Sequence, residues 1–402
     1  MRALFLTKEY PPNVYGGAGT HVGYLSHYLS KLMQIEVRCF GEQAWHAKGL
    51  CVRGFEEEGA SEFSCPKSLR PIFGALQRCL DFNTSAIDAD IVHCHTWYSY
   101  FGGIVAKLSY GIPLVVTVHS LELLRPWKSE QLGRGYGFTC WLESAALRMA
   151  DAVVAVSTET KEDILRLFGL PEHRVHVVYN GVDLDEYTPT QGVSALQSYG
   201  IDSSRPYVLF IGRMTRQKGI IHLVRAIQHF VPGLQVVVCA DAPDTPEIEA
   251  EIRSAIAKVQ QQRLRRVLWI QKRLDVQSKR ELYSHASVFV CPSIYEPFGI
   301  INLEAMACGT AVVASAVGGI KEVVVDEITG LLVPFRQSPD ATGPLDPERF
   351  ELDLAERVNA LMKDEGLRRK MGTAGRRRAE RMFSWNVIAQ QTQDLYGKLI
   401  GV

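Results

Sequence analysis

Short apolar runs recur along the whole chain, and segments with helical periodicity separate them. In the first half these runs are 3–7, 35–40, 90–94, 113–118, 151–156 and 175–178, and in the second half they are 207–212, 234–240, 267–270, 287–291, 310–315 and 330–333. Runs this short and apolar are typical of strands buried on both faces, and helical crossovers make such strands parallel. The pattern therefore predicts an α/β protein with doubly wound, Rossmann-like sheets.

The regular pattern is interrupted over residues 180–205, where turn residues and polar segments replace strands and helices. A chain of 402 residues also exceeds the length that one hydrophobic core usually organises. We therefore expect a first domain over residues 1–190 and a second over residues 191–380. The remaining residues, 381–402, have an amphipathic pattern that predicts a terminal helix.

The charge balance argues against several classes of protein. Lysine plus arginine and aspartate plus glutamate each number 44, and the arginine run near residue 377 is interleaved with glutamate, so nucleic acid is not an expected partner. The first residues predict a strand instead of a signal peptide, and no apolar run approaches the roughly 18 residues of a membrane span. Nine scattered cysteines without a Cys-x-x-Cys pair indicate reduced thiols. Together these features predict a cytoplasmic protein.

A strand, a sharp loop and a helix are predicted over residues 287–309. Gly299 lies at the turn into the helix, so the amides of Ile300, Ile301 and Asn302 are expected to point out of the helix start. The positive end of the helix dipole favours an anion there, and a diphosphate would suit it.

Two carboxylates flank this helix start, Glu296 in the loop and Glu304 inside the helix. They could act as a base or bind the hydroxyls of a ribose or another sugar. The alternative is a surface loop and a helix-start glutamate stabilised by the macrodipole. The pattern alone leaves both interpretations open.

Two further loops follow predicted strands. Gly16 and Gly17 precede a helix, where glycines let backbone amides approach a phosphate, although a tight turn explains them equally. In the second half, Arg213 and Lys218 bracket a loop and could neutralise a diphosphate leaving group. A solvated basic loop is the alternative for this second pair.

Histidines follow two strands of the first half. His93 and His95 lack a nearby carboxylate or third ligand, so a metal site is not expected. His95 and Trp97 are candidate acceptor-side residues that either contact sugar or pack in the core. His119 could hydrogen-bond sugar hydroxyls near the reacting carbon, or it could cap the turn.

Several separated motifs resemble those of retaining nucleotide-sugar glycosyltransferases with the GT-B fold. More narrowly, they are similar to bacterial glycogen synthases of the short, actinobacterial-type branch, which includes enzymes that make α-maltose 1-phosphate. The motifs are Glu9–Pro12 with Tyr15–Gly19, His95–Tyr98, Thr117–Glu122 with Arg125–Lys128, Asn180–Asp183, Gly212–Arg213 with Lys218–Gly219, and Glu296–Ala307. The resemblance implies two Rossmann-like domains facing a central cleft, with helix 381–402 crossing back onto the first domain.

The resemblance also implies roles for individual residues. In the first domain, a glycine-loop amide at Gly17 would contact the diphosphate and His119 would lie near the anomeric carbon. In the second domain, Arg213 and Lys218 would hold the diphosphate, Glu296 would contact the transferred glucose, Glu304 would bind the ribose, and the amides of Phe298, Gly299, Ile300 and Ile301 would complete the cradle.

The implied reaction transfers α-glucose with retention from a nucleotide sugar, ADP-glucose being favoured over UDP-glucose, with no metal and no further cofactor. The first expectation for the acceptor is the 4-hydroxyl of an α-1,4-glucan, as in a glycogen synthase. The alternatives are glucose 1-phosphate as acceptor, giving α-maltose 1-phosphate, or a related UDP-glucose-dependent transferase. Val14, Thr96 and Tyr98 depart from the longer synthases and leave the acceptor open. A sugar-binding protein without turnover belongs to a different class, and the oligomeric state stays open, with a homodimer as the candidate.

Overall fold

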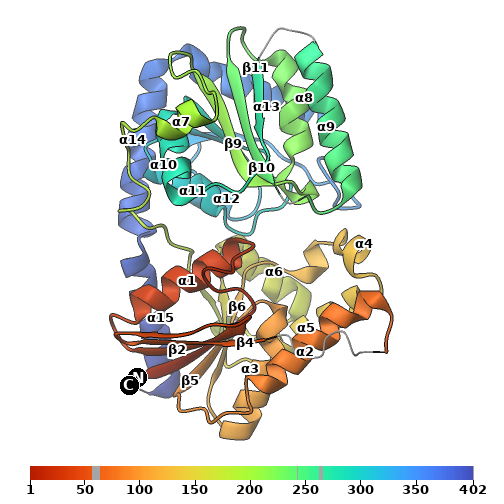
Figure 1. Ribbon diagram of the computed structural model, residues 1–402, viewed down its shortest axis with the longest axis vertical. Coiled ribbons are helices and arrows are strands. Elements are labelled where there is room, and N and C mark those ends of the chain that lie inside the picture. Colours follow the sequence, from red (N-terminus) through yellow and green to blue (C-terminus); the bar gives the residue numbers. More distant parts are fainter. Residues whose placement is uncertain (57–63, 242, 262–265, 402) are drawn as a thin grey trace. The chain divides into compact units, whose positions relative to one another are not determined.

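The computed structural model describes residues 1–56, 64–241, 243–261 and 266–401 (Figure 1). The chain divides into two compact units. Unit 1 comprises Met1–Gly181 and Trp385–Val402, and unit 2 comprises Val182–Ser384. The sequence predicted the first boundary between residues 190 and 191, within the polar segment, and the second between residues 380 and 381. In the structure these boundaries lie at Gly181/Val182 and Ser384/Trp385. Of the helices in the described ranges, none has the length and hydropathy needed to cross a lipid bilayer.

Unit 1 contains one mainly parallel sheet. Its strands are β1 (Arg2–Thr7), β2 (Gln34–Phe40), β3 (Ala44–Ala47), β4 (Leu50–Phe55), β5 (Ile91–His95), β6 (Leu114–Val118), β7 (Ala152–Ala155) and β8 (Val175–Val177). They lie in the order β3-β4-β2-β1-β5-β6-β7-β8, and β3 pairs antiparallel with β4. The predicted parallel sheet is confirmed. The sequence missed the hairpin of β3 and β4, because β3 is short and exposed throughout and so lacks the apolar pattern of a buried strand.

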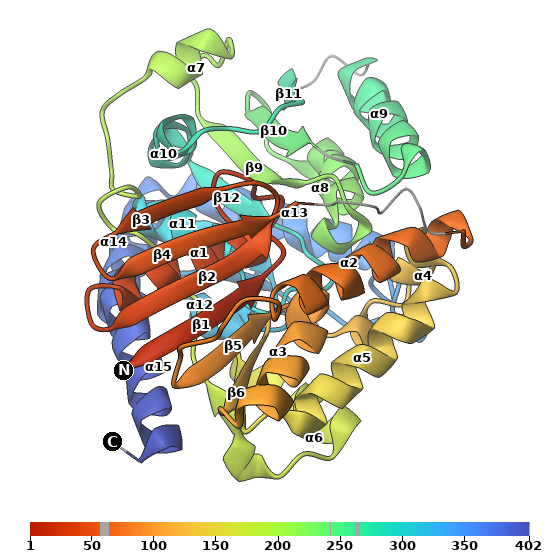
Figure 2. The same cartoon turned by 60° about the horizontal axis from the view of Figure 1, so that its bottom comes forward.

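Helices cover both faces of this sheet. They are α1 (Gly17–Leu29), α2 (Arg70–Asp81), α3 (Trp97–Tyr110), α4 (Lys128–Leu132), α5 (Gly135–Met149), α6 (Thr158–Phe168) and α15 (Trp385–Ile400). Successive residues of β1 point to opposite faces, so Leu4 and Leu6 pack with α2, α3, α5 and α6, whereas Ala3 and Phe5 pack with α1 and α15. Figure 2 shows α2, α3, α5 and α6 gathered on one side of the strands. The C-terminal helix is therefore part of the core of unit 1.

Unit 2 contains an all-parallel sheet. Its strands are β9 (Tyr207–Arg213), β10 (Gln235–Asp241), β11 (Arg266–Ile270), β12 (Val288–Cys291), β13 (Val312–Ser315) and β14 (Gly330–Val333), in the order β11-β10-β9-β12-β13-β14. Its helices are α7 (Ser194–Ser198), α8 (Ile220–Ala226), α9 (Pro246–Gln261), α10 (Val276–His285), α11 (Ile300–Ala307), α12 (Ile320–Val323), α13 (Pro347–Lys363) and α14 (Glu365–Met382). The second predicted doubly wound domain is thereby confirmed.

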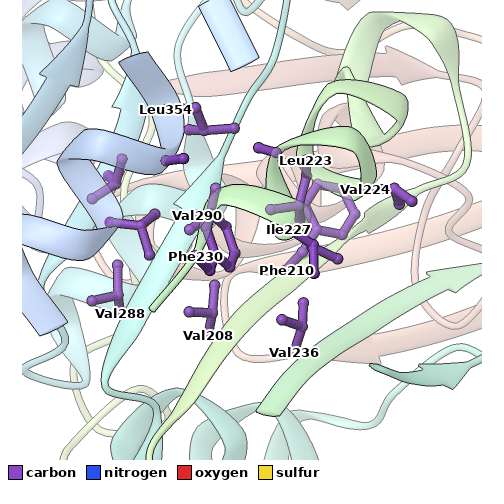
Figure 3. Close-up of a cluster of buried hydrophobic side chains, with 14 of the residues drawn as sticks. Val208, Phe210, Leu223, Val224, Ile227, Phe230, Val236, Val288, Val290 and Leu354 are labelled. Carbon is purple, nitrogen blue, oxygen red and sulfur yellow. The ribbon is translucent and has the colours of Figure 1, made fainter. Parts of the chain in front are cut away.

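One face of this sheet forms a large apolar core with α8, α9 and α13 (Figure 3). Val208 of β9 and Val290 of β12 are fully buried there beside Leu223 of α8 and Leu354 of α13. Each such side chain contributes about 1.5–3 kcal/mol by leaving water. This core fixes β9 and β12 as neighbours, and the loops that follow them carry candidate site residues.

Each sheet has a point at which the strand order reverses. In unit 1, β1 lies between β2 and β5, and in unit 2, β9 lies between β10 and β12. Ligands of α/β sheets bind beyond the carboxyl ends of the strands at such points. The Gly16–Gly17 loop follows β1 and His95 ends β5, whereas Lys218 follows β9 and Glu296 follows β12. The sequence candidates therefore lie at the two topological switch points.

Candidate active site

A lysine and a glutamate meet at the switch point of unit 2. The Nζ atom of Lys218 lies 2.5 Å from Oε2 of Glu296, and both side chains are largely buried. The hydroxyl of Ser293 donates to the same carboxylate oxygen at 3.2 Å. The structure thus brings together two predicted site residues from separate loops, and the negative charge of Glu296 holds the ammonium in place.

Two glycines clamp the loop that carries Glu296. Gly219 has φ +61°, and a Cβ there would lie 2.0 Å from the carbonyl oxygen of Pro292. Gly318 has φ +51°, and a Cβ there would lie 2.0 Å from the carbonyl oxygen of Glu296, which also accepts a hydrogen bond from the amide of Gly319 at 3.0 Å. Only glycine fits either position, so backbone contacts on both sides fix the loop. We refer to Gly219 and Gly318 below as the glycine clamp.

Helix α11 begins at this loop. Gly299 precedes it with φ +107°, and no side chain caps the helix start. The amide of Asn302 donates to the carbonyl of Gly299 at 3.0 Å, so the prediction that this amide points outward is wrong: a short first turn uses it. For the amides of Ile300 and Ile301 the anion site stays a prediction.

Two other residues of this segment are buried. Phe298 packs edge-on against Phe383, with the ring centroids 5.8 Å apart, so its side chain anchors the loop while its amide remains the predicted ligand contact. The side chain of Asn302 is fully buried, and within the described ranges its amide oxygen and nitrogen have no hydrogen-bond partner. A buried polar group of this kind is available to a water or a ligand.

Glu304 is buried in α11, and two groups of α10 hold its carboxylate. The hydroxyl of Tyr283 donates to Oε2 at 2.9 Å, and Nζ of Lys279 lies 3.4 Å from Oε1. The sequence missed both partners, although they lie four residues apart and therefore on one face of a helix. The carboxylate is oriented in advance, as binding of a ribose diol would require.

Arg213 ends β9, and its side chain is partly exposed. One guanidinium nitrogen lies 3.7 Å from Oδ1 of Asp244, a partner that the sequence did not indicate. Lys218 and Lys279 also lie within 4.0 Å of carboxylates. The candidate cations of unit 2 are thus paired with acidic side chains, and the alternative of a merely solvated basic loop does not describe Lys218.

The glycine loop of unit 1 folds around a carboxylate of its own. Oε2 of Glu9 accepts hydrogen bonds from the amides of Tyr15 at 2.9 Å and Gly16 at 2.8 Å. A Cβ at Gly19 would lie 2.8 Å from this oxygen, so a glycine leaves room for Glu9. Two adjacent amides aimed at one oxygen can bind an anion, and here the protein supplies that anion. Glu9 therefore occupies the amide of Gly16. Gly17 is the first residue of α1, and the contact of its amide with a diphosphate stays a prediction.

Three histidines gather near the switch point of unit 1. Nδ1 of His95 lies 3.1 Å from Nε2 of His119, and the ring of His21 lies 4.7 Å from that of His119. His21, on α1, was not predicted as a site residue. The sequence pattern of a helix does not show which strand ends the side chains of that helix will contact. Burial lowers the pKa of His21 to about 4 and holds the pKa values of His95 and His119 well below the usual range. These imidazoles are therefore neutral at pH 7, and a neutral imidazole both donates and accepts hydrogen bonds, which suits sugar hydroxyls.

The same three histidines could offer nitrogen atoms to a metal, since these atoms lie within 4.8 Å of one another. His93, considered with His95 as a metal pair, is not in this group: its nitrogens contact the hydroxyls of Tyr396 and Thr117. The absence of a metal from the reaction stays a prediction.

Trp97 is buried in the core of unit 1 at the start of α3. Its ring stacks on Tyr98, with the centroids 3.9 Å apart and the planes inclined by 25°. These contacts fit the second of the two roles that the sequence left open for Trp97, packing in the core instead of contact with sugar.

Both halves of the chain match known protein families. Residues 15–186 match the family described as Glycosyltransferase Family 4, and residues 194–378 match the family described as Glycosyl transferases group 1. The first match ends five residues beyond the boundary between Gly181 and Val182, and the second lies within unit 2.

Individual relatives extend the match to the full chain. The α-maltose-1-phosphate synthase of Mycolicibacterium smegmatis is 47% identical and covers 99% of this chain and 100% of its own. The D-inositol 3-phosphate glycosyltransferase of Xylanimonas cellulosilytica is 34% identical over 77% of this chain and 72% of its own. Among solved structures, sucrose-phosphate synthase from Thermosynechococcus elongatus superposes with a TM-score of 0.81 at 25% identity, with both chains fully covered.

Proposed function

We propose a reaction for this chain, which belongs to the GT-B family of nucleotide-sugar-dependent glycosyltransferases. The proposed reaction moves α-glucose from ADP-glucose to the 4-hydroxyl of α-glucose 1-phosphate, giving α-maltose 1-phosphate and ADP with retention of configuration. A full-length relative at 47% identity bears the name of this activity, and a second relative is named for another phosphorylated small molecule. These similarities favour the small acceptor over the glucan that the sequence suggested first.

The Lys218–Glu296 pair is the structural observation that carries the proposed transfer step, while the choice of acceptor rests on the relatives. When the bond between the anomeric carbon and the diphosphate breaks, negative charge grows on the departing oxygen. Lys218, together with Arg213, would stabilise this charge, and a fixed cation in a largely dry site is effective because it needs no reorganisation. The acceptor oxygen bonds to the anomeric carbon on the face that the diphosphate leaves, and its proton passes to the departing phosphate oxygen.

Other groups would orient the donor. Glu296 would accept hydrogen bonds from hydroxyls of the transferred glucose while holding Lys218. Glu304, held by Tyr283, would bind the ribose, and the start of α11 would receive a phosphate. Such positioning lowers the barrier by bringing the reacting atoms together before reaction.

The neutral His119 would serve the sugar in a different way. Its Nε2 already pairs with Nδ1 of His95 at 3.1 Å, which leaves Nδ1 to accept a hydrogen bond from one sugar hydroxyl, whereas in a protonated ring this nitrogen could only donate. The lowered pKa of His119 keeps the accepting nitrogen available at neutral pH.

Product analysis tests the proposal. Purified protein would receive ADP-glucose or UDP-glucose, each offered with α-glucose 1-phosphate or with glycogen, and products would be identified by chromatography and NMR. Maltose 1-phosphate formed with ADP-glucose and α-glucose 1-phosphate is the expected result. Elongated glycogen without maltose 1-phosphate would overturn the acceptor, and a preference for UDP-glucose would overturn the donor. A Lys218→Met sample prepared in the same way should form product about 10²–10³-fold more slowly, which excludes a contaminating enzyme as the source.

A further inference from the structure

Helix α15 contacts the histidines of unit 1 near its C-terminal end. The hydroxyl of Tyr396 lies 2.5 Å from Nδ1 of His93, and Nε2 of His93 lies 2.6 Å from the hydroxyl of Thr117. All three side chains are buried. Both ring nitrogens of His93 therefore have fixed partners, one of them on the C-terminal helix.

The same helix reaches the histidines again at its first residue. The ring of Trp385 lies 5.3 Å from that of His21, edge to face, and the ring of His21 lies 4.7 Å from that of His119. Trp385 is buried, and a Cβ at Gly181 would come within 2.5 Å of its indole ring. Gly181 thus leaves the space in which this tryptophan lies.

Two series of contacts therefore lead from α15 to His119. One runs from Trp385 through His21, and the other runs from Tyr396 through His93 and His95. The rings of His93 and His95 are 4.3 Å apart, and His95 in turn contacts Nε2 of His119. Trp385 and Tyr396 lie about three helical turns apart and so on one face of α15.

We propose that α15 positions His119 for sugar transfer, with Trp385 and Tyr396 as the positioning residues. A neutral imidazole has two tautomers, and the hydrogen bond made by one nitrogen decides which nitrogen carries the proton. The hydrogen bond between His95 and His119 sets which of their nitrogens carries the proton, and the packed rings hold His119 in one orientation. Helix α15 fixes both ends of this ring packing. This inference rests on the proposed role of His119 in sugar transfer.

A simpler role is that α15 only closes the hydrophobic core. Helix residues Ile388 and Leu395 are also buried, so loss of packing would destabilise unit 1 whatever His119 does. The experiment must therefore remove a hydroxyl without removing a ring.

Tyr396→Phe does this, because the ring stays and the hydrogen bond to His93 is lost. Thr392→Val is the matched control: Thr392 is buried on the same helix, but its hydroxyl donates to the carbonyl of Ile388, 2.9 Å away. We expect Tyr396→Phe to lower kcat about tenfold with little change in the KM for ADP-glucose, and Thr392→Val to leave both unchanged. Trp385→Phe should lower kcat by a similar factor.

NMR of the resting protein with ring-¹⁵N histidine gives a readout that does not depend on turnover. The His119 signals would be assigned from their loss in His119→Gln. In Tyr396→Phe we expect the ¹⁵N shifts of His95 and His119 to move, whereas in Thr392→Val they should stay. Unchanged His119 signals in both Tyr396→Phe and Trp385→Phe would overturn the inference, as would equal losses of kcat in Tyr396→Phe and Thr392→Val. If His119→Gln keeps full turnover, the proposed role of His119 fails, while the shifts still report whether α15 positions the ring.

Discussion

The two units hold their polar site residues by opposite means. In unit 2, Lys218 and Lys279 lie against the carboxylates of Glu296 and Glu304. In unit 1, the histidines near His119 pack against one another, against aromatic rings and against hydroxyls. An opposite charge keeps a buried group charged, whereas burial without one keeps a histidine neutral. These properties fit the roles proposed above, that of Lys218 in unit 2 at the diphosphate and that of His119 in unit 1 at a sugar hydroxyl.

This difference predicts which perturbation should most reduce activity or stability in each unit. Removing one partner of a buried pair leaves an uncompensated charge, so unit 2 should respond most strongly to changes in single side chains. Protonating a buried imidazole places a charge where none is compensated, so unit 1 should respond most strongly to acid.

The largest expected effect is that of Lys218→Met. Loss of a cation placed at the leaving group should lower kcat/KM by about 10²–10³-fold. Steady-state kinetics with ADP-glucose measure this loss, with Lys258→Met on the exposed face of α9 as the control. Kinetics equal to those of the control would remove Lys218 from the proposed mechanism.

Glu304→Gln tests the ribose contact and should act mainly on binding. We expect the KM for ADP-glucose to rise about tenfold with a smaller change in kcat, because a charge-assisted hydrogen bond to the donor is weakened in the ground state as well. Tyr283→Phe, which removes only the hydroxyl that orients Glu304, should raise KM less. A pure loss of kcat would indicate that Glu304 acts in the transition state instead.

Acid should destabilise unit 1 through its buried histidines. The pKa values of His21 and His93 are lowered to about 4 and about 3, while unfolded histidine titrates near 6.5. Between these values the unfolded chain binds more protons, so the free energy of unfolding should fall as pH decreases from 6.5 towards 4, by up to about 1.4 kcal/mol per histidine and pH unit. Urea unfolding at several pH values measures the slope. His46→Gln, at an exposed position, should leave it unchanged, and a flat profile would contradict the neutral cluster.

A buried carboxyl pair in unit 1 should give a smaller slope of opposite sign. Burial and the neighbouring Glu122 raise the pKa of Glu143 to about 8, and Arg125 pairs with Glu122. Between pH 4.5 and 8 the folded state holds the extra proton, so this group loses its stabilising contribution as pH rises towards 8. The loss should be visible above pH 6.5, where the histidines no longer titrate, and it should be absent in Glu143→Gln.

The smallest expected effect is that of metal removal. If His21, His95 and His119 bind hydroxyls and not a metal, prolonged treatment with a chelator should leave kcat unchanged. Loss of turnover that added Zn²⁺ restores would assign these histidines as ligands and overturn the prediction of metal-independent transfer.

Much of the fold could be predicted from the sequence because buried parallel strands leave a local signal. The runs that became β9 and β12 could be located, and the motif resemblance pointed to Lys218 and Glu296. The side chains that pair with Arg213 and Glu304 could not be found in this way. Asp244 and Tyr283 reach their partners only through tertiary folding, and no spacing along the chain encodes those contacts.

Two further omissions have local physical causes. Glu9 precedes the glycine loop in a motif that was recognised, yet a sequence cannot show that its carboxylate turns back to the amides of Tyr15 and Gly16. The amide of Asn302 was expected to point outward, and a short first turn of α11 uses it instead. In both cases the backbone conformation, which depends on neighbouring loops, determines which acceptor the amides bind.

The glycine clamp also bears on how this gene can vary. Every amino acid other than glycine carries a Cβ, so any missense change in the codon for Gly219 or Gly318 places a carbon about where a backbone oxygen already lies. Alanine, often the mildest replacement, is no exception at these two codons. Random mutagenesis followed by selection for transferase activity should therefore recover substitutions on the exposed helices freely, while these two codons accept only synonymous changes.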